Sequence, residues 1–207
     1  MIKNLDATLT EIKKAFVEVN KWMFEGKLDE PILIVQSSSR AKANALGWFT
    51  LGKVWRNKET GQTFHEITIC AEALNQPMYV ILEVLVHEMV HYWCKIHGIQ
   101  NCSKSQYHNK NFKAAAEKFL LICEDKPHPK YGYAFTKPSQ KLLMFFDRMD
   151  LDEEAFDIAM DDNEGKKKES SQRHVYLCDG CEKTFKTVCL LTSATCAACN
   201  GTFLPKP

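Results

Sequence analysis

The chain has 207 residues, which is enough for one well-packed domain and a small second unit. Its formal net charge is +1, but the window from Asp150 to Glu164 holds eight acidic residues and no lysine or arginine, so the rest of the chain carries +9. This balance excludes a chain that is strongly basic or strongly acidic throughout, and it leaves a weak electrostatic preference for polyanions outside the acidic window.

Cysteine usage and the lack of long apolar runs indicate the compartment. Nine cysteines are an odd number, and five of them are scattered without the spacing of a disulfide framework. The first ten residues lack the apolar core of a signal peptide, and no run approaches the ~18 apolar residues of a transmembrane helix. We therefore expect a soluble intracellular protein, in the cytoplasm or in the nucleus of a eukaryote, with no membrane partner.

The first third of the chain predicts one helix and three strands. Apolar residues three or four apart predict an amphipathic helix over 6–24, with Thr8 or Thr10 available as its cap. Strands are expected over 31–35, 45–51 and 64–70. Gly47, in the second of them, indicates a close backbone approach or a bulge. We expect the three strands to form a short antiparallel meander.

The middle of the chain predicts two more helices. The sequence Asn-Gln-Pro at 75–77 supplies a helix start, and the run 78–93 is almost wholly apolar, which is typical of a buried helix. Gly98 is the expected end of that helix. A further amphipathic helix is expected through 112–122. The aromatic and basic segment 131–146 is either an arm that covers the domain or part of a linker.

The buried helix contains an H-E-x-x-H motif, His87-Glu88-Met89-Val90-His91. Residues four apart lie one helical turn above each other, so both imidazoles face the same way, with Glu88 beside them. So short a motif also arises by chance, but these polar side chains are costly in an apolar helix unless a divalent metal satisfies them. The motif therefore predicts half of a catalytic zinc site, with Glu88 as the general base.

A catalytic zinc ion needs a third protein ligand, and three residues compete for that role. His97 has the spacing of the longer motif H-E-x-x-H-x-x-G-x-x-H, but Cys94 stands where that motif has its helix-ending glycine. In a helix that continues to Gly98, His97 lies about 80° from the ligand face. We therefore favour His108, which follows a loop and precedes a helix, over His97 and over Glu117.

Four cysteines near the C-terminus form two C-x-x-C pairs. Cys178 and Cys181 are separated by fourteen residues from Cys196 and Cys199, which is close to the spacing of a four-cysteine zinc site. Redox motifs or disulfides are the alternatives, but a unit this short needs a metal to fold. The basic residues around it, which would suit nucleic acid, are Arg173, Lys183, Lys186 and Lys206.

Four segments carry a resemblance to a known family. They are Trp22-Met23-Phe24-Glu25-Gly26-Lys27-Leu28, Glu66-Ile67-Thr68-Ile69, Leu85-Val86-His87-Glu88-Met89-Val90-His91, and His108 followed by Phe112. In these segments the chain resembles the SprT-like zinc metalloproteases, which include Spartan-type proteases that cleave protein crosslinked to DNA. The resemblance spans residues 5–125 and extends to the C-terminal cysteine unit.

The resemblance implies which residues form the site. It implies His87, His91 and His108 as zinc ligands and Glu88 as the catalytic residue. One position departs from the family pattern: many members have glycine after the third histidine, where this chain has Asn109.

These features together predict an α+β fold in three parts. We expect a zincin-like minimal metalloprotease domain over 1–149, an acidic and polar linker over 150–173, and a four-cysteine zinc ribbon over 174–207. The domain would comprise an N-terminal helix, a three-stranded antiparallel sheet, the H-E-x-x-H helix and a further helix. The expected cofactors are one catalytic and one structural Zn²⁺.

The expected activity is zinc-dependent hydrolysis of peptide bonds in protein associated with or crosslinked to DNA. Single- or double-stranded DNA would bind the basic surface and the ribbon, and an extended substrate would add to the edge of the strand 64–70. The residue that stabilises the oxyanion is left open among Tyr92, Tyr107, Tyr131 and Tyr133, of which Tyr92 also suits the core. The alternatives are a nucleic-acid-associated adaptor with little hydrolytic activity and a processing protease unrelated to DNA.

Overall fold

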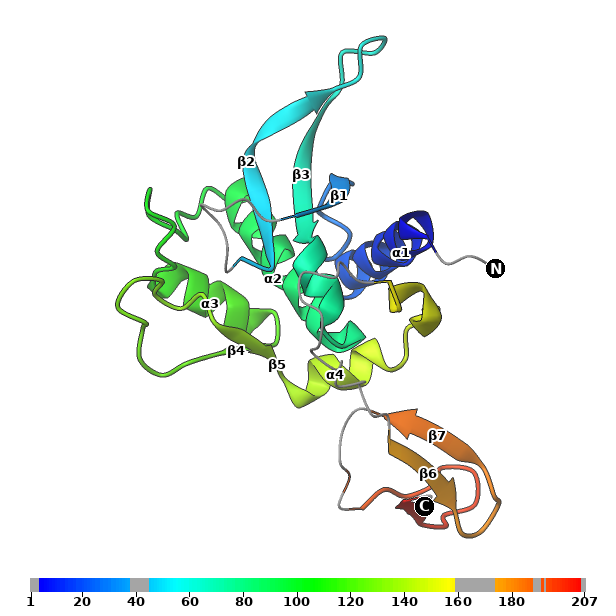
Figure 1. Cartoon of the computed structure of the whole chain (residues 1–207). Coiled ribbons are helices and arrows are strands. Elements are labelled where there is room, and N and C mark those ends of the chain that lie inside the picture. Colours follow the sequence, from blue (N-terminus) through cyan, green and yellow to red (C-terminus); the bar gives the residue numbers. More distant parts are fainter. Residues whose placement is uncertain (1–3, 38–44, 159–173, 188–190, 192, 206–207) are drawn as a thin grey trace, which may run out of the picture.

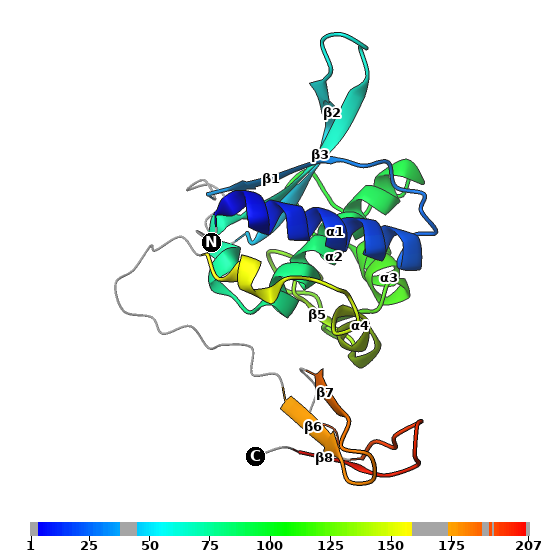
Figure 2. The same ribbon diagram turned by 90° about the vertical axis from the view of Figure 1, so that its right-hand side faces the viewer.

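The computed structural model describes residues 4–37, 45–158, 174–187, 191 and 193–205. Helix α1 (Leu5–Met23) confirms the predicted N-terminal helix, although its cap is Asn4, whose side chain accepts the N–H of Ala7, and neither of the expected threonines. Thr8 is buried and donates to the carbonyl of Ala155. Figure 2 shows α1 lying alongside the central helix α2, beneath the strand β1.

Three strands form the main sheet: β1 (Ile32–Gln36), β2 (Gly47–Arg56) and β3 (Thr63–Cys70). The expectation of an all-antiparallel meander is wrong, because the order is β1-β3-β2 and β1 runs parallel to β3. The physical reason lies in β3, where residues 67–70 are all buried, Thr68 included. Such a strand belongs in the centre of a sheet, whereas alternation of apolar residues does not encode pairing order.

Helix α2 (Met78–Ile96) is the centre of the domain, and it packs against α1, β2, β3 and the later helices (Figure 1). Its N-terminal cap is Pro77, since Asn75 belongs to a preceding 3-10 turn, Ala71–Asn75. Gly98 takes a positive φ of 66° just past its end, as predicted. Among the described residues, no helix is long and apolar enough to cross a bilayer.

The segment after α2 wraps around it. Helix α3 (Lys110–Lys118) ends earlier than expected, because Leu120 takes a positive φ of 63° and the chain continues as the strand β4 (Leu121–Cys123). β4 pairs with β5 (Thr136–Pro138), and α4 (Gln140–Phe146) follows. The segment 131–146 is therefore an arm that covers the domain.

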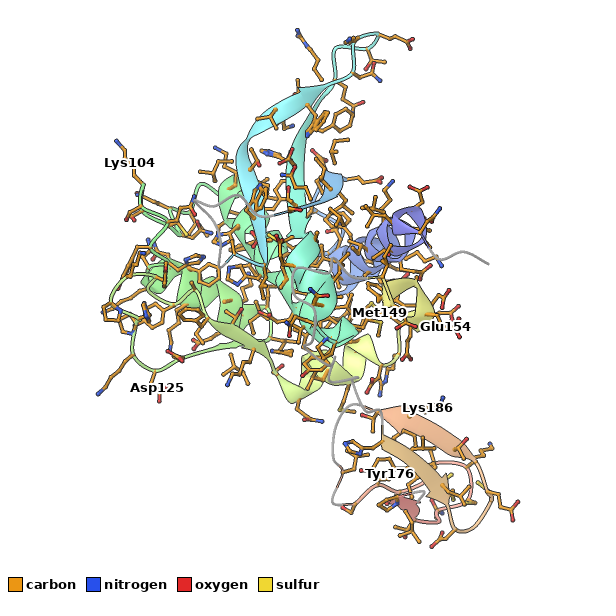
Figure 3. All side chains as sticks on the ribbon, viewed as in Figure 1. Lys104, Asp125, Met149, Glu154, Tyr176 and Lys186 are labelled. Atoms are coloured by element: carbon orange, nitrogen blue, oxygen red, sulfur yellow. The ribbon has the colours of Figure 1, made fainter. Side chains whose placement is uncertain are left out.

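Residues 150–158, which the sequence assigned to a linker, pack against α1. The turn η3 (Glu153–Phe156) buries Ala155 and Phe156 in the core, and the backbone N–H of Asp152 donates to the Glu11 carboxylate over 3.0 Å. Figure 3 labels Met149 and Glu154 on this side of the domain. The packed unit therefore continues to residue 158, and the remainder of the predicted linker, 159–173, lies outside the described residues.

The C-terminal unit is a small sheet of three strands in the order β7-β6-β8. They are β6 (His174–Cys178), β7 (Thr184–Thr187) and β8 (Phe203–Pro205). Tyr176, labelled in Figure 3, is buried and stacks on Phe185, whose ring also contacts Phe203 edge-on. Three aromatic rings are a small core, which is typical of a unit that needs a further cross-link.

We expect Gly47→Ala to destabilise the domain by about 1–3 kcal/mol, because the added methyl has no room. A Cβ at Gly47 would lie 2.7 Å from Val84 Cγ1 and 2.9 Å from the Thr68 carbonyl oxygen. Gly52→Ala in the same strand is the matched control, since its nearest neighbour would be Val54 Cγ1 at 3.7 Å. Urea unfolding measures both variants, and equal stability would contradict the close approach.

Candidate metal centre

Three imidazoles converge at the centre of the domain, two from α2 and one from the loop before α3. The Nε2 atoms of His87 and His91 are 3.2 Å apart, and that of His108 lies 3.3 Å from the first and 3.0 Å from the second. Ligand nitrogens on a tetrahedral zinc ion, at Zn–N distances of 2.0–2.1 Å, are about 3.3 Å apart. The spacing therefore fits a three-histidine zinc site.

Each helical histidine is oriented from its other ring nitrogen. The Nδ1 atom of His87 lies 3.0 Å from the hydroxyl of Thr136, and that of His91 lies 2.8 Å from the side-chain amide of Asn101. The ring of Phe112 contacts all three imidazoles, with centroid distances of 4.5–4.7 Å. Polar partners thus fix the rings from behind, while an apolar ring limits their movement.

The three imidazoles are neutral at physiological pH. Burial, followed by the neighbouring imidazoles, lowers the pKa of His87 well below its ordinary value. Burial, followed by the charge of His108, lowers the pKa of His91 to about 3, and burial lowers the pKa of His108 to about 4. A neutral imidazole is the form that ligates a metal, so the donor set fits a divalent ion without a deprotonation step.

His108 is held by backbone pairing. Its N–H donates to the carbonyl of Tyr131 over 3.1 Å, and its carbonyl accepts the N–H of Tyr133 over 3.0 Å. Gly132, between them, has a φ of 65°, and a Cβ there would lie 2.0 Å from the His108 carbonyl oxygen. Asn109 caps α3 by accepting the N–H of Phe112, among others, which gives this departure from the family pattern a structural role.

The two competing residues lie away from the cluster. His97 is exposed, stacks on Trp93 at 4.2 Å and places its Nδ1 atom 2.8 Å from the carbonyl oxygen of the same residue. Glu117 forms an exposed ion pair with Lys113 at 3.3 Å. Within the described residues, His108 therefore lies against the two motif histidines, whereas His97 and Glu117 do not.

Glu88 lies next to His87, between the start of β2 and the loop that contains Cys102. Its side chain is 6% exposed, and a Cβ on Gly47 would lie 3.4 Å from its Cγ. Burial, and after it the charge of Glu88, raises the pKa of Cys102 to about 12. The structure therefore places a buried carboxylate on the helix that carries His87 and His91.

The tyrosines considered as oxyanion stabilisers differ in position. Tyr92 is buried against Phe49 and His65, and burial raises its pKa to about 12, so it belongs to the core. Tyr133 is buried beneath Lys113. Tyr107 and Tyr131 are partly exposed, and the ring of Tyr131 stacks on His128.

The four C-terminal cysteines form a second cluster, with all four sulfur atoms within 4.8 Å of one another. Cys178 Sγ and Cys199 Sγ are 3.4 Å apart, and Cys181 Sγ and Cys196 Sγ are 3.6 Å apart, too far for disulfides. Sulfur ligands of a tetrahedral zinc ion are about 3.7 Å apart, so the donor set fits zinc. The backbone N–H of Ala198 lowers the pKa of Cys196 to about 7, which favours the thiolate.

The comparison with family models decides the family of this chain. The model of the SprT-like family matches residues 12–126, more than half of the chain. The chain belongs to the SprT-like family. The match begins within α1 and ends after β4, and so contains the three clustered histidines and Glu88 of this SprT-like domain. Comparisons with curated proteins and with solved structures found no match.

Sequence reasoning missed three residues of the SprT-like domain that support the imidazoles. Asn101 and Thr136 carry no motif, and only the fold brings them to the site. Glu83 did carry a signal, because it is the one acidic residue between Met78 and His87. Burial raises its pKa to about 7, opposed by a hydrogen bond from Thr136.

We expect His108→Ala to lower the zinc content of the full chain by about one equivalent, since two imidazoles alone hold zinc weakly. His97→Ala is the matched control and should keep the zinc content of the wild type. Metal analysis after gel filtration measures both. Full zinc in the His108 variant would exclude it as a ligand.

We also expect Cys181→Ser to remove zinc from the C-terminal cluster and to unfold β6–β8, since the small aromatic core cannot hold the sheet alone. Amide signals of residues 174–187 in NMR spectra should collapse to the dispersion of an unfolded segment, while those of α2 persist. Cys102→Ser should change neither. A folded ribbon with serine at position 181 would contradict a structural metal there.

Proposed function

We propose that this chain is a zinc-dependent endopeptidase that cleaves protein bound or crosslinked to DNA. The proposal rests mainly on the convergence of three neutral imidazoles. Two of them lie on α2, which also carries the buried carboxylate of Glu88. Membership in the SprT-like family supports the same activity. The proposed ligands are His87, His91 and His108.

Glu88 would act first as the general base and then as the general acid of the reaction. A zinc ion at this site supplies Lewis-acid activation of a water molecule and of the scissile carbonyl. The Glu88 carboxylate accepts the proton of the attacking water and then delivers it to the leaving amine. Glu88 follows His87 directly on α2 and is only 6% exposed, which supports this role.

The proposed route for the substrate backbone is the outer edge of β2. The strand 64–70, expected from sequence to receive the substrate, is the central strand β3, which lies between β1 and β2 and is paired with β1 over 66–70. β2 is an outer strand, and it begins at Gly47, where its backbone approaches Val84 and Glu88. An extended peptide added there would pass the carboxylate.

The proposed DNA contact involves the ribbon and the basic surface. Lys183 and Lys186 are exposed in the ribbon, while Arg173 and Lys206 lie outside the described residues. The chain outside 150–164 carries a net charge of +9, which supports binding to a polyanion. Against the adaptor hypothesis stands Glu88, because an adaptor has no use for a general base beside a metal site.

We expect Glu88→Gln to lower the rate of cleavage of a DNA-bound test protein by about 10²–10⁴-fold, the usual contribution of a general base. Zinc content should stay at the wild-type level, since Glu88 is not among the three clustered histidines. Cleavage is followed by gel electrophoresis of the full chain with and without single- or double-stranded DNA.

The control for the substrate is the same test protein without DNA. Equal cleavage by wild type and Glu88→Gln would overturn the catalytic assignment. Cleavage at one rate regardless of DNA would support the processing protease instead.

A further inference from the structure

We infer that Glu83 and Thr136 form a relay that fixes the tautomer and orientation of His87, so that its Nε2 lone pair faces the metal site. Both would be positioning residues, acting on the metal through His87. The inference rests on the proposed function, because it concerns how tightly the histidine cluster holds zinc.

The relay joins two elements that are far apart in sequence. Glu83 lies on α2 one turn before His87 and is 8% exposed, and Thr136 is the first residue of β5. The hydroxyl of Thr136 donates to Glu83 Oε1 and lies 3.0 Å from His87 Nδ1. The pairing of Thr136 with Cys123 in the β4–β5 ladder holds the backbone of Thr136 beside α2.

The direction of the hydrogen bonds follows from counting protons. A threonine hydroxyl has one proton, and that of Thr136 is donated to Glu83 Oε1. Because Thr136 gives its proton to Glu83, its oxygen must accept from His87, so the proton of the His87 ring sits on Nδ1. The Nε2 atom is then unprotonated, as a metal ligand requires.

The chemistry around Glu83 favours this role over simple packing. A carboxylate in the apolar run 78–86 is costly, and leucine would fill the same space without that cost. Burial raises the pKa of Glu83 to about 7, so above that pH the carboxylate puts a negative charge two hydrogen bonds away from the metal ligand and makes its imidazole a stronger donor. The buried charge therefore serves the site more than it serves the fold.

The test measures zinc affinity of the histidine site in the full chain by chelator competition, with the cysteine site as an internal reference. We expect Thr136→Val to weaken zinc binding about 10–100-fold, the usual effect of losing a partner of a ligand. Glu83→Gln keeps an acceptor but not the charge, and it should have a smaller effect. Thr136→Ser restores the hydroxyl and should restore the affinity.

Thr8→Val is the matched control, because the hydroxyl of Thr8, like that of Thr136, donates to one acceptor inside the domain, in this case the Ala155 carbonyl. It should lower the stability of the zinc-free chain and leave zinc affinity unchanged. A second readout is the tautomer of His87 in the zinc-loaded chain, observed by long-range ¹H–¹⁵N NMR. The proton should be on Nδ1 in wild type.

Two results would overturn the relay. One is wild-type zinc affinity in both Thr136→Val and Glu83→Gln, and the other is equal weakening by Thr136→Val and Thr8→Val. In either case the proposed protease activity would stand. Absence of zinc from the histidine cluster of the wild type would instead remove the proposed function together with the relay.

Discussion

Helix α2 carries Glu83, His87, Glu88 and His91 into a mostly apolar interior, and each of these groups needs a partner there. Burial without one would cost several kcal/mol per group by the ordinary scale of polar transfer. The rest of the domain supplies the partners from segments far along the chain: Asn101, His108 and Thr136. The loops and short strands after α2 are therefore part of the site, although few of their residues carry a recognisable motif.

The same constraint explains the close fit on the other side of the helix. The start of β2 approaches α2 at Gly47, where any side chain would meet Val84 and the backbone of β3. This contact brings an outer strand of the sheet beside Glu88 without an intervening side chain. Both the packing of β2 on α2 and the approach of β2 to Glu88 require a residue without a side chain at position 47, and glycine is that residue.

Much of the site could be predicted because helical geometry fixes relative directions over short distances. The phase of α2 excluded His97 once the helix was expected to reach Gly98, and the structure places that ring on Trp93. Strand order and the end of α3 could not be predicted, since pairing depends on contacts between distant segments and Leu120 ends the helix in a conformation unusual for leucine. Asn101 and Thr136 could not be predicted for a similar reason: a single polar residue outside a motif has no sequence pattern.

The loop that holds His108 does so through main-chain hydrogen bonds to Tyr131 and Tyr133, on either side of Gly132. Main-chain hydrogen bonds do not depend on the identity of the neighbouring side chains, so most residues of this loop can be substituted without moving the imidazole. Gly132, which has no room for a Cβ, resists replacement. The rim of the site can therefore diversify, and with it the residues that meet a substrate, while the position of the third imidazole is preserved.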